Sequence, residues 1–162
     1  MNYHNITKDD MKNGDGLIVV LLVAGCEHHC KNCQNPITWN PKGGLKFGEE
    51  EEQEIFEQLQ KDYISGITFS GGDPLHPLNR VVVKKLILKI KRNFPNKTIW
   101  IYTGYKYEQI CWMDVLNHID VLVDGPYIEE LRDVNLPWVG SSNQRVIDVQ
   151  KTRRAGEVIL HE

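Results

Sequence analysis

The sequence contains no long hydrophobic run and no polybasic block, and each absence excludes a class of protein. The longest apolar stretch, Leu17–Gly25, is far shorter than the roughly 20 residues that a membrane-spanning helix needs. Basic and acidic side chains number 19 and 22, and this balance argues against general nucleic-acid binding or attraction to anionic membranes. The polar opening of the chain does not resemble a signal peptide. We therefore expect a cytoplasmic protein that binds neither nucleic acid nor membrane.

Length and composition are ordinary for one globular domain. The chain has 162 residues, of which 41% are hydrophobic and 25% charged, so it can bury a full core without disulfides. It contains no internal repeat and no linker. We expect residues 1–162 to form a single domain.

Cysteine is scarce, but three of the four cysteines lie within eight residues. Cys26, Cys30 and Cys33 have the spacing C-x3-C-x2-C, which is typical of metal ligands in a reducing compartment rather than of a disulfide framework. Three local thiolates could hold three irons of a [4Fe–4S] cluster and leave the fourth iron open to a ligand. Alternatively, His28 or His29 could complete a structural Cys3His zinc site. The triplet alone does not decide between the two.

The hydrophobic pattern predicts strands that alternate with helices. Residues 17–24 are almost continuously aliphatic, as in a strand buried on both faces. Further strands are predicted over 66–70, 98–102 and 119–123, and helices over 49–63, 82–93 and 107–116. This alternation is typical of a parallel sheet with right-handed crossovers. For the last segment we expect strands over 145–149 and 157–160, with a basic turn between them over 151–154.

Unusual residues follow the predicted strands at their carboxyl ends, where parallel sheets bind ligands. They are Cys26, Gly71–Asp73, Thr103–Tyr105 and Asp124–Gly125. The two glycines lack Cβ atoms and allow backbone to approach a ligand closely, and Asp73 could accept hydrogen bonds from a ligand ammonium group. The same residue types also form ordinary tight turns.

The cysteine triplet and four further blocks resemble a known family. The triplet after the first strand and Gly-Gly-Asp-Pro after the second resemble the radical S-adenosylmethionine enzymes. The closer similarity is to the activating proteins of the anaerobic (class III) ribonucleoside-triphosphate reductases, and it spans most of the chain. The blocks that carry it are Ser70–Asn79, Trp100–Tyr105, Val121–Gly125 and Gly140–Gln144. The fold implied is α/β, a shortened and laterally open (β/α) partial barrel of the radical S-adenosylmethionine type, because 162 residues cannot supply six strand–helix units.

The resemblance implies one [4Fe–4S] cluster per chain, ligated by Cys26, Cys30 and Cys33, with S-adenosylmethionine on the fourth iron. The cofactor contacts implied lie in three segments: Asn32, Cys33 and Gln34; Gly71, Gly72 and Asp73; and Thr103. Two features depart from the family pattern. Asn32 replaces an aromatic residue that could stack on adenine, and Asp73 is one methylene shorter than the usual glutamate. No catalytic residue beyond the cluster ligands is implied.

The activity implied is that of an oxidoreductase, a glycyl-radical-enzyme activating enzyme of the [formate-C-acetyltransferase]-activating type. Such an enzyme reductively cleaves S-adenosylmethionine to a 5′-deoxyadenosyl radical, which generates the glycyl radical on the reductase. The partners implied are the glycyl-radical subunit of the anaerobic reductase and an electron donor such as flavodoxin or a thiol system. Two alternatives remain: a radical S-adenosylmethionine enzyme for another glycyl-radical partner or a small molecule, and a non-catalytic zinc-binding interaction module.

Four other residues have competing interpretations. We expect Cys111 to be a buried small hydrophobe rather than a fourth ligand. His76 could cap its turn or contact a partner, and Trp138 could be a core residue or an interface residue. Asp124 is a weaker candidate for a cofactor contact.

Overall fold

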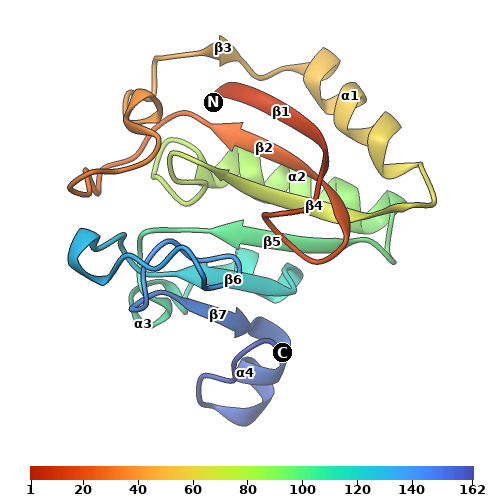
Figure 1. The fold of residues 1–162 in the computed structure, drawn as a ribbon. Coiled ribbons are helices and arrows are strands. Elements are labelled where there is room, and N and C mark those ends of the chain that lie inside the picture. The colour runs from red at the N-terminus through yellow and green to blue at the C-terminus, as the bar shows by residue number, and fades with distance from the viewer.

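The computed structural model describes residues 1–162 as one seven-stranded mixed β-sheet with four α-helices (Figure 1). The strands are β1 (Asn2–Asp10), β2 (Leu17–Val23), β3 (Leu45–Lys46), β4 (Ile64–Gly71), β5 (Thr98–Tyr102), β6 (Val121–Asp124) and β7 (Arg145–Asp148). The helices are α1 (Glu49–Leu59), α2 (Arg80–Asn93), α3 (Tyr107–Ile110) and α4 (Val149–Ala155). No helix combines the length and hydropathy that a membrane span requires.

The centre of the sheet is parallel, as the alternating pattern predicts. The strand order is β3-β1-β2-β4-β5-β6-β7, and β2, β4, β5 and β6 pair in parallel. Helix α1 lies in the crossover from β2 to β4, α2 in that from β4 to β5, and α3 in that from β5 to β6. The carboxyl ends of the four strands therefore meet at one edge of the sheet, which we call the carboxyl rim.

The prediction of a shortened, laterally open (β/α) partial barrel is wrong. The sheet is not closed, and its edges are β3 and β7. Strand β1 pairs antiparallel with β2, and β7 pairs antiparallel with β6. Strand β1 precedes the parallel series and β7 follows it, so the series contains three crossovers. An antiparallel strand can join its neighbour without a crossover helix. The chain resembles an open α/β sheet rather than a segment of a barrel.

Three local predictions also differ from the structure. Strand β1 was not expected, because its sequence NYHNITKDD is polar and has no apolar run. The predicted basic turn over 151–154 lies inside α4, which Asp148 caps by accepting a hydrogen bond from the Lys151 backbone N–H. In place of a final strand, Leu160 forms one isolated bridge with Ile147.

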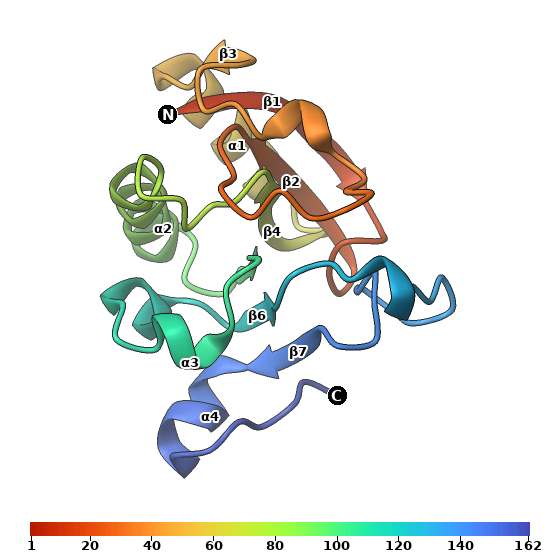
Figure 2. The ribbon, with the colours of Figure 1, turned by 90° about the vertical axis from the view of Figure 1, so that its left-hand side faces the viewer.

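The main core lies between the sheet and its helices. On α2 the buried residues Val83, Leu86, Ile87 and Ile90 recur with the period of one helix face. They pack with alternate residues of the strands, such as Phe69 of β4. Figure 2 shows α2 and α3 on one side of the sheet and the loop after β6 on the other.

A smaller cluster covers the opposite face of the sheet. It is built on Trp100, Val121 and Val123, against which Trp138 packs edge to face at a centroid distance of 5.2 Å from the Trp100 ring. The His161 ring also packs on Trp100 here. Tyr102, Trp138 and Val139, which pack against this cluster, line the cavity described below.

Close contact between β4 and β5 depends on Gly66. A Cβ at this position would lie 2.1 Å from the carbonyl oxygen of Thr98 on the neighbouring strand. Gly66→Ala should therefore lower the free energy of unfolding by about 1–3 kcal/mol, measured by urea unfolding. The matched control is Gly48→Ala, where the nearest atom to a new Cβ would be 3.9 Å away. Equal stabilities of the two variants would contradict the prediction.

Candidate metal and cofactor site

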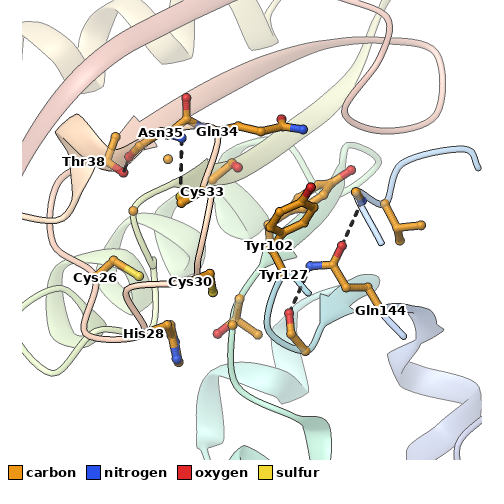
Figure 3. A pocket seen from close by; sticks show the side chains of 18 of the residues that line it. Cys26, His28, Cys30, Cys33, Gln34, Asn35, Thr38, Tyr102, Tyr127 and Gln144 are labelled. Atoms are coloured by element: carbon orange, nitrogen blue, oxygen red, sulfur yellow. Dashed lines mark hydrogen bonds between the residues drawn. The ribbon is translucent and has the colours of Figure 1, made fainter. Parts of the chain in front are cut away.

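A cavity of about 500 Å³ opens at the carboxyl rim (Figure 3). One wall is the segment Cys26–Trp39, which we call the cysteine wall. The strand ends form the floor, and the segment Gly125–Gln144, which we call the loop wall, faces the cysteines. Figure 3 shows Cys26, Cys30 and Cys33 on one side of the cavity and Tyr127 and Gln144 on the other.

The three cysteines lie in one tight loop and are free, half-buried thiols. The loop turns through residues with positive φ, His29 at 49° and Asn32 at 56°, and asparagine tolerates this conformation well. Asn32 therefore shapes the loop and does not line the cavity. The base of the loop is fixed because the Cys26 backbone N–H donates to the carbonyl of Trp39 at 3.1 Å.

The environment of Cys26 disfavours its thiolate in the free protein. Burial raises the pKa of the Cys26 thiol above its ordinary value of 9.0, and the negative charge of Asp73 acts in the same direction. The nearby backbone N–H groups of His28 and His29 oppose this increase in the pKa. A positively charged centre bound at the loop would reverse the balance, because metal binding displaces the thiol proton.

The glycine pair after β4 allows the cysteine loop to cross the strand end. A Cβ on Gly71 would lie 2.6 Å from the backbone of Val23, and one on Gly72 would lie 2.6 Å from the carbonyl oxygen of Gly25. Gly71 also has a φ of 100°, which a residue with a Cβ rarely adopts. Both glycines line the cavity, and they also permit β2 and β4 to end side by side.

The Asp73 carboxylate points into the protein and not into the cavity. It is 1% exposed and accepts hydrogen bonds from Thr103 Oγ1 at 2.9 Å, the Gly104 N–H at 3.0 Å and the Leu75 N–H at 2.8 Å. His28 Nε2 lies 2.6 Å from its Oδ2 atom. Protein groups therefore surround this carboxylate on both oxygens.

The predicted site residues divide into two groups. Those that line the cavity are Cys26, Cys30, Cys33, Gln34, Gly71, Gly72 and Thr103. Asn32 is exposed at a turn of the cysteine loop, and Asp73 is buried and bonded to Thr103. Cys111 was expected to be buried but is exposed, and it does not line the cavity. His76 caps its turn, since its Nδ1 accepts a hydrogen bond from the Leu78 N–H.

Asp124 has a structural role at the end of β6. Its carboxylate is 1% exposed and forms a two-pronged ion pair with Arg145, with the shorter contact at 2.6 Å. It also accepts a hydrogen bond from the Tyr107 N–H at 2.7 Å. Asp124 thus joins β6, β7 and α3 and does not line the cavity.

Sequence reasoning assigned no cofactor role to the loop wall. Its members that line the cavity include Tyr127, Arg132, Val134, Trp138 and Gln144. Gln144 fixes the loop by accepting hydrogen bonds from the Gly140 and Ser141 N–H groups and donating to the Gly125 carbonyl. The block Gly140–Gln144 was a visible signal, but its pattern gave no indication that it faces the cysteines.

The donor set fits an iron–sulfur cluster. Three half-buried thiols line one cavity. The Nε2 atom of His28 is bonded to Asp73, and the ring of His29 stacks on Trp39 at 4.5 Å. Three sulfurs spaced along one wall suit a polynuclear centre in which each thiolate has its own iron.

Comparisons with known proteins agree with this chemistry. A family model described as a 4Fe-4S single cluster domain matches residues 12–147. Several relatives are named anaerobic ribonucleoside-triphosphate reductase-activating protein. That of Enterobacteria phage T4 is 44% identical over 146 residues, covering 90% of this chain and 93% of the relative. Those of Escherichia coli K12 and Haemophilus influenzae are 43% and 42% identical, covering 97% and 96% of the relatives and 90% and 89% of this chain.

Because Cys26 is partly buried, we predict that its alkylation in the metal-free protein requires a higher pH than that of an ordinary thiol. Because the pKa of its thiol is raised, the reactive thiolate forms only as the pH rises past the ordinary value of 9.0. The rate of modification by iodoacetamide, followed at Cys26 by peptide mass spectrometry, should have its midpoint above pH 9.0. A midpoint below that value would show that the backbone donors outweigh burial.

Proposed function

This chain belongs to the 4Fe-4S single cluster domain family and to the family of anaerobic ribonucleoside-triphosphate reductase-activating proteins, and from that premise we propose that it is a radical S-adenosylmethionine enzyme that activates such a reductase. The observation that carries the proposal is the placement of three free thiols in one cavity at the carboxyl rim, in a chain that a 4Fe-4S single cluster domain model matches over residues 12–147.

The cysteine wall would hold the cluster. We assign one thiolate each from Cys26, Cys30 and Cys33 to three irons, which leaves the fourth iron for S-adenosylmethionine. When bound, these groups would supply a one-electron reductive cleavage of the sulfonium, giving methionine and a 5′-deoxyadenosyl radical that takes a hydrogen atom from a glycine of the reductase. The protein contributes orientation, exclusion of water and control of the cluster environment.

The floor of the cavity would position S-adenosylmethionine. Gly71 and Gly72 expose backbone at the cavity surface, and Thr103, directly after β5, lines the same cavity. Because the Asp73 carboxylate is already satisfied by protein donors, we propose that it acts on the cofactor through Thr103, whose hydroxyl it holds. No aromatic residue precedes Cys33, so the aromatic rings available to adenine are those of other cavity residues, such as Trp39 and Tyr102.

The partner would be the glycyl-radical subunit of an anaerobic ribonucleoside-triphosphate reductase, since the relatives carry the name of its activating protein. The loop wall would face that partner, because it lies across the cavity from the cysteines and exposes Val134. A flavodoxin or thiol system as electron donor and a cytoplasmic location complete the proposal, and the four free thiols agree with a reducing compartment.

Cluster assembly tests the metal assignment directly. The chain reconstituted without oxygen should bind about four irons and four sulfides, and Cys26→Ala, Cys30→Ala or Cys33→Ala should each lose most of this content. Cys111→Ala is the matched control and should retain it, because Cys111 is exposed and outside the cavity. Iron and sulfide analysis with visible absorption measures the outcome. A colourless protein with one zinc per chain would overturn the assignment and favour the interaction module.

Radical transfer tests the substrate. With S-adenosylmethionine and a reductant, the loaded chain should produce a glycyl radical on a co-expressed anaerobic ribonucleoside-triphosphate reductase, detected by electron paramagnetic resonance. Cys30→Ala should abolish the signal, because its cluster would be lost. Cleavage of S-adenosylmethionine without any radical on that reductase would favour another glycyl-radical partner or a small-molecule substrate.

A further inference from the structure

One side chain of the cysteine loop bonds directly to the buried carboxylate behind the cavity. His28 lies midway between Cys26 and Cys30, and its Nε2 atom is 2.6 Å from Asp73 Oδ2. The histidine side chain is 15% exposed and the aspartate side chain 1%. Asp73 is itself fixed to β5 through Thr103 and Gly104. The contact therefore joins the cysteine loop to the ends of β4 and β5.

The structure provides a fitted space for the His28 ring. A Cβ on Gly104 would lie 2.4 Å from Cδ2 and 2.7 Å from Nε2 of His28, so only glycine at position 104 leaves room for the imidazole. Tyr105 packs against the ring in an edge-to-face contact at 4.4 Å. The ring is thus held by its hydrogen bond and by packing from residues of the same strand end.

The other attachments of the loop are weaker or lie at its base. Lys31 pairs with Glu130 at 3.7 Å between two strongly exposed side chains, and such pairs contribute little. Glu27 bonds to the hydroxyl of Tyr105 but is exposed. His28 is the only side chain between Cys26 and Cys30 that hydrogen-bonds to a buried partner, and loss of one partner of a buried carboxylate is costly.

We infer that His28 is a positioning residue that latches the cysteine loop onto the carboxyl rim through Asp73. The latch fixes the loop that carries Cys26 and Cys30 relative to Gly71, Gly72 and Thr103, and so governs how firmly the loop retains its metal centre. The inference rests on the proposed function in one respect, namely that the three thiols hold an iron–sulfur cluster. The inference gives Asp73 the role of supporting the loop that carries the cluster ligands.

The rate of iron loss from the reconstituted full chain tests the latch. The anaerobic protein is mixed with excess chelator and the decay of its visible absorption is followed. His28→Ala should release iron about tenfold faster or more, in the range usual for lost supporting contacts of metal ligands. Gly104→Ala should also release iron faster. Its new Cβ would displace the His28 ring from Asp73, although His28 itself is unchanged.

Two further variants separate the latch from a general weakening of the loop. His28→Gln carries an amide nitrogen near the place of Nε2, and it should restore most of the retention that His28→Ala loses. His29→Ala is the matched control in the same loop, since His29 stacks on Trp39 and makes no contact with Asp73. Its rate should stay within about twofold of the wild type. The reduced cluster of His28→Ala should also show altered electron paramagnetic resonance g-values, whereas that of His29→Ala should not.

The outcomes are distinguishable from those of the proposed function. Wild-type release rates in both His28→Ala and Gly104→Ala would overturn the latch while leaving the cluster assignment intact. Equal acceleration in His28→Ala and His29→Ala would also overturn it, because the effect would then belong to the loop as a whole. A wild-type chain that takes up no cluster would overturn both.

Discussion

A carboxylate removed from water must be surrounded by hydrogen-bond donors, and the arrangement of the carboxyl rim follows from how the chain meets this requirement at Asp73. The donors come from its own turn at Leu75, from the end of β5 at Thr103 and Gly104, and from the cysteine loop at His28. Segments far apart in the sequence are thereby fixed to one buried point. The loop that carries the thiols is thus held by protein hydrogen bonds to this one carboxylate.

The parallel centre of the sheet makes this convergence possible. The carboxyl ends of parallel strands lie at the same edge of the sheet. The segments that follow these strands therefore all begin at the carboxyl rim. The antiparallel strands β1 and β7 do not extend the series but cover its flanks, and β7 brings Arg145 to the buried Asp124. The two buried aspartates at the ends of β4 and β6 thus have different tasks: Asp73 supports the cysteine loop and Asp124 joins the last strand to the sheet.

The sequence pattern predicted the four central strands, α1, α2 and the single edge that gathers the unusual residues, because continuous apolar runs and a helical period are local signals. It could not predict β1, whose polar residues pair through backbone groups, or the open sheet, which depends on the antiparallel pairing of β1 with β2 and of β7 with β6. The cysteine triplet was visible from its spacing. The inward orientation of Asp73 and the loop wall were not, since both depend on tertiary contacts such as His28 with Asp73 and Gln144 with Gly125.

The two walls of the cavity are held mainly by different contacts. The cysteine wall follows β2 and is bonded to Asp73 through His28, whereas the loop wall follows β6 and is held by hydrogen bonds of Gln144, Ser141 and Asn143 and by packing of Trp138 on Trp100. Changes in the loop wall would therefore leave the bond between His28 and Asp73 in place, and the cysteine wall would lose the exposed Lys31–Glu130 pair. With this division, the loop that would recognise a macromolecule can differ between relatives while the loop that carries the thiols stays the same. One fold could then serve several different partner enzymes.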